Sequence, residues 1–214
     1  NIPGSLAEFS AETAALSGEA GLPALVATDQ EGGIIRRVPG DNSPSASQLR
    51  SKAPEASFDA FEQRGALLES VGVSVNFGIV ADVASDKSSF ISERSFGSTG
   101  EDAAARVAEA VAGESTVLST LKHFPGHGAA QGDSHFSIPS TSMTLDEWST
   151  THALPFEAGI DAGAPFVMFG HLAFTSVDPQ PATFSARWHQ ILRDDLGFDG
   201  VSITDDMGML EQSG

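Results

Sequence analysis

The sequence predicts an α/β fold built on a parallel sheet, either a barrel or a doubly wound sheet. Short apolar runs alternate with segments of helical pattern along the chain, which is typical of successive β-α-β units. Most of these runs are continuously apolar, as strands buried on both faces are. Each run also ends in a polar side chain that is able to do chemistry.

Each apolar run is expected to form one strand. The five runs share a length of seven to ten residues and few charges before their last positions. They are PALVATD (23–29), VSVNFGIVAD (73–82), STVLSTLKHF (115–124), APFVMFGH (164–171) and GVSITDD (200–206).

The segments between these runs carry helix start and stop signals. Two of them fit a capping box, in which the first side chain caps the helix and the fourth reaches back, and a third begins with a capping serine. The signals are Ser5 with Glu8, Thr144 with Glu147, and Ser185, whose helix is expected to stop at Gly197. We expect further helices over 53–72 and 102–112, and a surface loop over 38–50.

Composition narrows the classes of function. The formal net charge of −18 argues against nucleic acid and against anionic membrane surfaces, so solubility is the simplest role of this acidity. No window approaches the roughly 18 apolar residues of a membrane span. The absence of cysteine excludes disulfides, thiolate nucleophiles and Cys-ligated zinc, and leaves the compartment open between cytoplasmic and secreted. The start at Asn1 fits a mature form or a fragment, and the stop soon after a strand-like run favours a fragment.

The ends of the expected strands are where functional side chains gather. In parallel α/β folds the carboxyl ends of the strands share one face, and that face carries the active site. We therefore expect one cleft lined by the polar strand-end residues, which are Asp29, Asp82, Lys122 with His123, His171, and Asp205 with Asp206.

The segment LKHFPGHGAAQGDSH (121–135) holds three histidines, His123, His127 and His135. A metal site is the first interpretation, but the Pro-Gly turn between the first two forbids the helical spacing of zinc proteases. A loop that gathers three imidazoles, with His171 as a fourth ligand, stays an alternative. The segment lacks the pattern of a phosphate-binding loop, G-x-x-x-x-G-K-[ST], so nucleotide binding is not favoured.

An acid/base device fits this segment better. Asp133 and His135 are two residues apart, so both side chains can lie on the same side of a loop. The carboxylate would stabilise the imidazolium and fix the ring, as a general acid requires. Asp205, at the end of another strand, is then the candidate nucleophile of a glycosidic cleavage, which needs one acid and one carboxylate.

Several motifs together resemble one family. KHFPGHG with the downstream D-S-H, ATDQEGG (27–33), SERSFG (92–97) and LGFDGVSITDDMGM (196–209) are similar to the glycoside hydrolase family 3 β-N-acetylhexosaminidases, which recycle peptidoglycan N-acetylglucosamine. The matches run in the family's order from about residue 20 to residue 210. The resemblance implies a TIM-type (β/α)8 barrel that is incomplete in this chain, with its first and last strands missing, and a single partial catalytic domain over residues 1–214.

The resemblance also implies residue roles. Asp205, which follows Thr204, would be the nucleophile, with Asp206 as a capping neighbour. His135 would be the acid/base with Asp133 as its partner. The expected sugar-binding residues are Asp29, Arg37, Arg94, Lys122 and His123, while His127 and His171 would pack the loops. Family members often carry Arg directly after the two glycines, where this chain has Ile34, although Arg36 and Arg37 follow.

The implied activity is that of a retaining exo-acting β-N-acetylglucosaminidase with a carbohydrate substrate. It needs no cofactor and no metal, and we expect no nucleic-acid partner and no membrane span. Four alternatives stay open: a β-glucosidase-like relative, a phosphorolytic relative, a metal-dependent hydrolase on a similar barrel, and a non-catalytic sugar-binding fragment.

Overall fold

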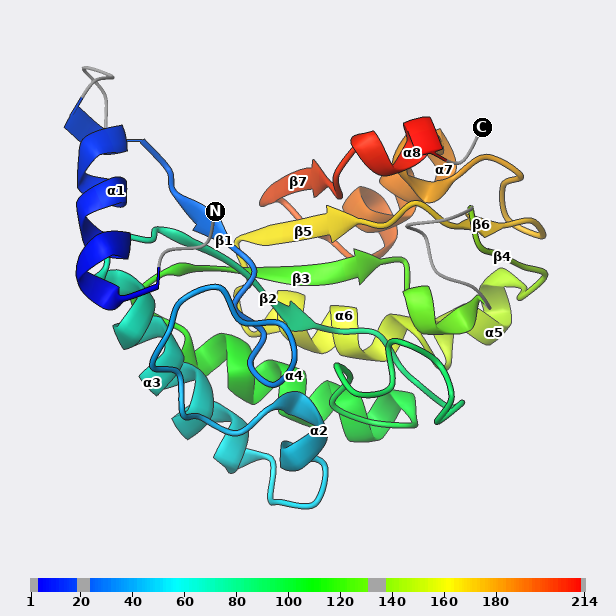
Figure 1. Ribbon diagram of the computed structural model, residues 1–214. Helices are drawn as coiled ribbons and strands as arrows, with labels where there is room; N and C mark the ends of the chain where they lie inside the picture. The colour runs from blue at the N-terminus through cyan, green and yellow to red at the C-terminus, as the bar shows by residue number, and fades with distance from the viewer. Residues whose placement is uncertain (1–3, 19–23, 131–137, 213–214) are drawn as a thin grey trace.

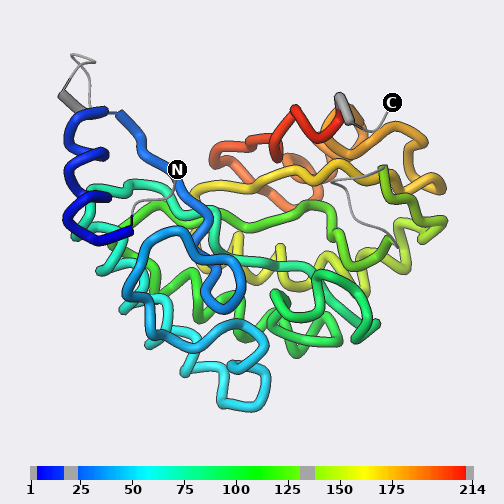
Figure 2. Tube along the Cα trace, in the orientation of Figure 1, coloured from blue at the N-terminus to red at the C-terminus, as the bar shows by residue number. Residues whose placement is uncertain are grey.

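The computed structural model describes residues 4–18, 24–130 and 138–212. Five parallel strands form the main sheet, and their order across the sheet is their order in the chain, β1-β2-β3-β5-β7. The colours of Figure 2 show this directly, since they run from blue to red across the sheet. The strands are β1 (Ala27–Thr28), β2 (Val75–Val80), β3 (Leu118–Phe124), β5 (Phe166–Phe169) and β7 (Val201–Thr204).

All five expected strands are confirmed, but the predicted TIM-type (β/α)8 barrel is wrong, also in its incomplete form. The sheet is open and curled, with β1 and β7 as its two edges, and no pairing joins these edges in the described residues. Closing a barrel takes about eight strands, tilted so that the last one pairs with the first. Five strands span too little of that circumference to meet.

Helices cover one face of the sheet. α3 (Glu55–Ser70), α4 (Gly100–Gly113) and α6 (Ala153–Asp161) lie side by side below it in Figure 1, with α4 in contact with the other two. α1 (Leu6–Gly18) lies beyond the amino ends of the strands. The remaining elements are short: α2 (Ala46–Leu49), α5 (Leu145–Ser149), α7 (Ala186–Gln190), α8 (Gly208–Gln212), the 3₁₀ turns His127–Ala129 and Ala182–Phe184, and the strands β4 (Ser140–Thr141) and β6 (Ala173–Phe174), which pair with each other.

The expected caps form, with small differences. Thr144 and Glu147 make the complete capping box of α5, and Ser185 accepts from Trp188 at the start of α7. After α7 the chain continues as one π-helical stretch, Ile191–Asp195, before Gly197 takes a positive φ of 64°. Ser5 accepts from the Glu8 amide, whereas the Glu8 carboxylate reaches Gly4.

The prediction of a surface loop over 38–50 is confirmed only in part, because residues 38–45 form no helix or strand but a short helix follows and several side chains are buried. Ser45 and Gln48 form a full capping box that starts α2, and this turn buries Ala46 and Leu49. Val38 is buried as well, at 1% exposure. Proline, serine and glycine dominate this stretch and are typical of loops, but the S-x-x-Q pattern was the signal for a helix start.

The core lies between the sheet and its helices, and aromatic rings fill its centre. Phe124, the last residue of β3, meets Trp148, Phe156, Phe169 and Trp188 edge to face, with ring centroids 5.1–6.0 Å apart. β3 therefore ends in a cluster of buried aromatic rings, which holds the end of the strand and the two residues before Phe124 in place.

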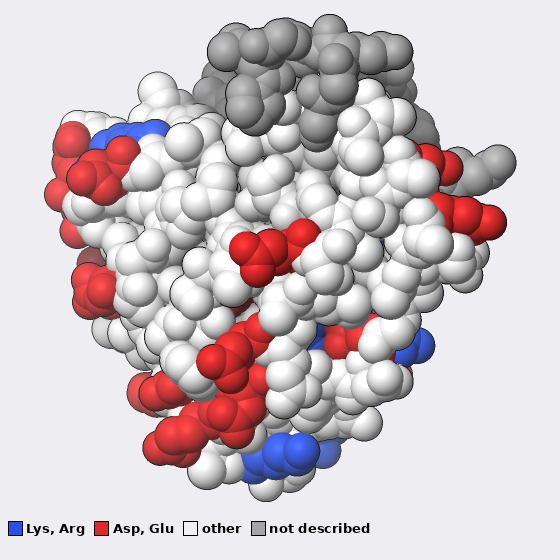
Figure 3. Space-filling view, turned by 90° about the vertical axis from the view of Figure 1, so that its left-hand side faces the viewer, with Lys and Arg blue, Asp and Glu red and all other residues white. Residues whose placement is uncertain are grey.

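The surface reflects the composition. Acidic side chains outnumber basic ones on the face shown in Figure 3, in keeping with the net charge of −18. Within the described ranges no helix combines the length and the hydropathy required to cross a lipid bilayer.

Candidate active site

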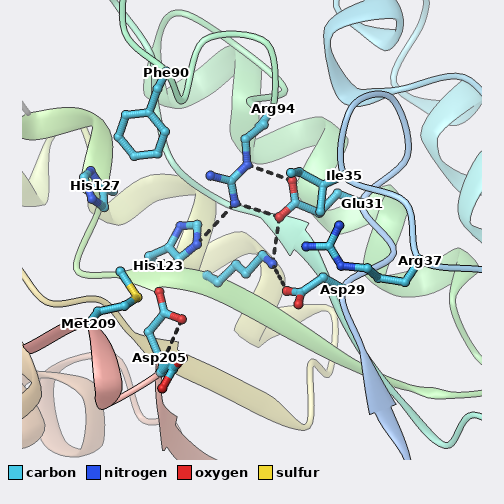
Figure 4. A pocket seen from close by; sticks show the side chains of 12 residues that line it. Asp29, Glu31, Ile35, Arg37, Phe90, Arg94, His123, His127, Asp205 and Met209 are labelled. Carbon is cyan, nitrogen blue, oxygen red and sulfur yellow. Dashed lines mark hydrogen bonds and ion pairs between the residues drawn. The ribbon is translucent and has the colours of Figure 1, made fainter. Parts of the chain in front are cut away.

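A pocket of about 300 Å³ opens at the carboxyl ends of the strands. The predicted nucleophile and all predicted sugar-binding residues line it, whereas the strand-end residues Asp82 and His171 do not. Figure 4 shows these side chains converging on one cavity, and they come from the ends of β1, β3 and β7, from the loops after β1, β2 and β3, and from α8. The lining residues are Asp29, Glu31, Ile35, Arg37, Phe90, Arg94, Lys122, His123, His127, Asp205, Asp206 and Met209.

A network of ion pairs forms one wall of the pocket. Lys122 Nζ lies 2.7 Å from Asp29 Oδ1 and 2.7 Å from Glu31 Oε1. Arg94 binds the same Glu31 carboxylate with two nitrogens, at 2.7 and 2.8 Å. Burial alone would raise the pKa of Glu31, but Lys122 and Arg94 lower it to about 2. Glu31 is thus a fixed anion that holds two pocket cations in place, and sequence reasoning missed it.

His123 is oriented by a buried aspartate. Its Nδ1 lies 2.7 Å from Asp82 Oδ2, and Asp82 also accepts from the backbone amides of His123 and His127. Arg94 Nη2 lies 3.4 Å from His123 Nε2. Because an arginine nitrogen only donates, this contact fits a ring that carries its hydrogen on Nδ1 and turns the Nε2 lone pair toward the pocket.

Asp82 is fully buried and does not line the pocket. Burial would raise the pKa of Asp82, but His123 and the His127 amide hold it below its ordinary value. Its place at a strand end was foreseen, whereas its role as the partner of His123 depends on a contact across 41 residues of sequence.

Asp205 stands at the end of β7, opposite the ion-pair wall. Its amide donates to Phe169 O at 2.9 Å, and its Oδ1 accepts from the Asp206 amide at 2.8 Å. Burial alone would raise the pKa of Asp205. The combined effect of His123, the Asp206 amide and Lys122 is larger and lowers the pKa below its ordinary value. The carboxylate is therefore ionised at neutral pH, as a nucleophile must be.

Asp206 and His171 support this strand end. Asp206 Oδ1 accepts from the Gly208 amide at 2.8 Å and so starts α8. His171 Nε2 lies 3.0 Å from Asp206 O, and its Nδ1 lies 2.7 Å from Thr183 Oγ1. His171 is buried and does not line the pocket, so it fixes the strand end and is not one of the converging groups.

A less polar wall faces the ion pairs. It consists of Phe90, His127 and Met209, with the rings of Phe90 and His127 edge to face at 4.8 Å. Burial lowers the pKa of His127 to about 4, although Asp82 opposes the shift. His127 is therefore neutral at physiological pH. The pocket thus has one strongly polar side and one neutral side, with Asp205 between them (Figure 4).

Arg37 differs from the other two pocket cations. Its guanidinium makes no hydrogen bond or ion pair with the described residues, and no dashed line reaches it in Figure 4. Ile34, which stands where the family often has Arg, is 63% exposed and lies outside the pocket lining. Arg36 donates to Asp41 O instead of entering the pocket.

Asp133 and His135 lie outside the described residues. Elsewhere in the chain, within 4–18, 24–130 and 138–212, no group of three or more His, Asp or Glu side chains is placed to hold a metal ion.

Comparison with protein families gives one match over almost the whole chain. The model of the glycosyl hydrolase family 3 N-terminal domain covers residues 4–213. A beta-hexosaminidase of Stenotrophomonas maltophilia (strain R551-3) is 36% identical over 209 residues, which are 92% of this chain and 62% of that protein. The chain thus spans less than two thirds of that relative.

Solved structures agree with this match. A glycoside hydrolase family 3 β-N-acetylglucosaminidase from Paenibacillus sp. str. FPU-7 superposes with a TM-score of 0.92 at 32% identity, over 96% of this chain and 41% of that one. A β-N-acetylhexosaminidase from Beutenbergia cavernae DSM 12333 superposes with a TM-score of 0.85 at 34% identity, over 97% of this chain and 66% of that one.

Proposed function

The chain belongs to glycosyl hydrolase family 3, and from this membership and the pocket we propose that it forms the sugar-binding part of a retaining, exo-acting β-N-acetylglucosaminidase. The proposed substrate is a terminal β-linked N-acetylglucosamine, as in fragments of peptidoglycan or chitin. Residues 1–214 would act as one catalytic domain. Since the chain covers 62% of its Stenotrophomonas relative, the activity of the whole protein is part of this proposal.

Asp205 is the observation that carries the proposal. It is an ionised carboxylate in a pocket, and within the described residues only one of its two oxygens accepts a hydrogen bond. The other oxygen is available to attack an anomeric carbon. Lys122 adds positive potential that keeps the carboxylate charged without contacting it.

The ion-pair wall supports a polyhydroxylated substrate. Glu31 fixes the charged donors Lys122 and Arg94, and Lys122 in turn holds the acceptor Asp29. Charged groups make the strongest hydrogen bonds to neutral hydroxyls, and fixed ones lose little entropy when they bind. The His123 ring accepts from Arg94 and so helps to fix that guanidinium, while Arg37 adds a donor that needs no rearrangement of other pairs.

The proton transfers are assigned to His135 with Asp133, on the strength of the family resemblance. His135 would protonate the leaving oxygen while Asp205 forms the glycosyl ester. The neutral His135 would then take a proton from water as the water releases the sugar from Asp205. This order keeps the anomeric configuration, because the anomeric carbon undergoes two substitutions and each of them inverts it.

A pair of chromogenic substrates tests the proposed activity. We expect hydrolysis of an aryl β-N-acetylglucosaminide, with the matching β-glucoside turned over much more slowly. Faster turnover of the β-glucoside would contradict the proposed substrate, and turnover of neither would contradict the activity.

Replacement of Asp205 by Asn tests its role. We expect a loss of about 10³-fold or more in kcat with unchanged folding, because the amide is a poor nucleophile. Asp206→Asn is the matched comparison, since Asn also caps α8, and its loss should stay well below that of Asp205→Asn. Wild-type turnover in Asp205→Asn, or a larger loss in Asp206→Asn, would contradict the assignment.

A further inference from the structure

Gln30 lies between the two pocket acids Asp29 and Glu31, yet its own side chain is fully buried away from the pocket. Its Oε1 accepts from the amides of Arg37 at 2.8 Å and Val38 at 2.9 Å. Its Nε2 donates to a carboxylate and to Val38 O. A glutamine amide has two donors and two accepting lone pairs, so all four of its hydrogen bonds are made here.

The direction of the Gln30 amide is fixed by a buried ion pair. Asp41 Oδ2 receives the Gln30 Nε2 hydrogen bond at 2.9 Å and the Arg64 Nε hydrogen bond at 2.8 Å. The side chains of Asp41 and Arg64 are 1% and 0% exposed. Since a carboxylate only accepts, the nitrogen end of the amide must face Asp41, and the oxygen end must then face the Arg37 and Val38 amides.

The backbone of Gln30 is held as firmly as its side chain. Asn76 of β2 accepts from the Gln30 amide and donates to Gln30 O, both at 3.1 Å. The same Asn76 nitrogen donates to Glu114 Oε1 at 2.6 Å. Gly78 leaves the room for this contact, because a Cβ there would lie 2.2 Å from Asn76 Nδ2. Gln30 is therefore a rigid reference point at the end of β1.

The position of Arg37 depends on Gln30 more than the positions of the other pocket cations do. Lys122 and Arg94 are held at their charged ends by Glu31. The guanidinium of Arg37 has no such partner in the described part of the chain, so its place follows from its backbone. That backbone is tied to Gln30 through the Arg37 amide.

We propose that Gln30 is a positioning residue that places Arg37 in the pocket and thereby serves substrate binding. The proposal rests on the proposed function, because it gives Arg37 a hydrogen bond to the sugar. The two residues then have different roles: Gln30 affects how tightly the sugar is bound, whereas Asp205 affects the rate of the chemical step.

A double-mutant cycle in the complete protein tests this link. Gln30→Met keeps the size of the side chain and removes its hydrogen bonds. We expect KM for the aryl β-N-acetylglucosaminide to rise about tenfold, the worth of one hydrogen bond to a charged group, with kcat within about threefold. In the Arg37→Ala background the same change should raise KM less than about twofold, because coupled residues are not additive. An equal rise in both backgrounds would overturn the proposal, and so would a fall in kcat alone.

Gln30→Glu and hydrogen exchange complete the test. The Glu oxygens still accept from Arg37 and Val38, so we expect near-normal KM despite lower stability. Exchange of the Arg37 amide should speed up at least about tenfold in Gln30→Met and stay slow in Gln30→Glu. Fast exchange in both, or failure of both variants to fold, would overturn the proposal, because Gln30 would then serve the fold alone. If the wild type cleaves no glycoside, the proposed function fails, while the exchange data still report on Gln30.

Discussion

Glu31 and Glu114 are both buried glutamates, at 4% and 2% exposure, but their surroundings shift the carboxyl pKa in opposite directions. In the pocket, Lys122 and Arg94 overcome the effect of burial and lower the pKa of Glu31 to about 2. Beside β2, burial raises the pKa of Glu114 to about 8. The Asn76 hydrogen bond and the charge of Arg64 oppose that rise, and Asp41 adds to it.

The hydrogen-bonding or ion-pair partner, and not the depth of burial, therefore decides whether these two carboxyl groups are charged. Glu31 faces two cations at hydrogen-bonding distance, whereas the one hydrogen bond of Glu114 from the described residues comes from a neutral amide. The carboxyl group thus stays charged at the pocket, where a polar ligand can use the charge, and is neutral beside β2, where Asn76 needs only a neutral acceptor.

Replacement of each glutamate by glutamine tests this difference with the largest expected effect. We expect Glu31→Gln to lower the free energy of unfolding by about 3–5 kcal/mol at pH 7, because it leaves Lys122 and Arg94 buried without their shared anion. Glu114→Gln should instead raise it by about 3 kcal/mol at pH 7, because the wild-type carboxyl, ionised in the unfolded chain, must take up a proton to fold and the amide need not. Urea unfolding measures both, and equal losses would show that the two regions do not differ.

The pH dependence of stability is the second test. Glu31 has a folded pKa below its ordinary value of 4.5, so its contribution is full above pH 4.5 and is lost as the pH falls through about 2. Glu114 has a folded pKa above the same value, so its contribution is full below pH 4.5 and is lost as the pH rises through about 8.

From pH 4.5 to 8 the loss from Glu114 should be on the order of 3–4 kcal/mol, and Glu114→Gln should remove that slope. Unfolding curves at several pH values give the slope of each protein. The same slope in wild type and variant would mean that Glu114 ionises freely.

Gly78 gives the mildest test, because it alters the space around Asn76 and no charge. An added Cβ would meet the Asn76 amide at 2.2 Å, so that side chain must move. We expect Gly78→Ala to lower the free energy of unfolding by about 1–3 kcal/mol, as overpacking does. Gly4→Ala is the control, since among the described residues its Cβ would contact Glu8 alone, at an ordinary 3.5 Å. A neutral result at Gly78 would mean that Asn76 does not need its present place.

Much of the fold was predictable because its central strands are buried on both faces. β2 and β5 are largely apolar runs, and their positions follow from that pattern. The extent of the sheet was not predictable in this way. Alternating strands and helices fit an open sheet as well as a closed barrel, and the number of strands that pair is set by tertiary contacts. The resemblance therefore misled about closure.

The candidate site was predictable where position along a strand was enough. Asp29, Lys122 and Asp205 all follow from the strand-end rule or from the family motifs, and all line the pocket. Glu31 was missed, although it is part of the same motif as Asp29. Its importance comes from Arg94 and Lys122, which lie 63 and 91 residues further along the chain, and no local pattern reports such a pairing.

The ion-pair wall also bears on how the pocket responds to its solvent. Lys122 and Arg94 are matched by Asp29 and Glu31 inside the pocket, so these cations need no mobile counterions. A neutral sugar that enters the pocket then displaces water and hardly any salt. Screening by dissolved ions weakens interactions between exposed charges and acts much less on buried pairs. Affinity for a neutral sugar should therefore stay nearly constant from low to high ionic strength, even though the surface of the protein is strongly acidic.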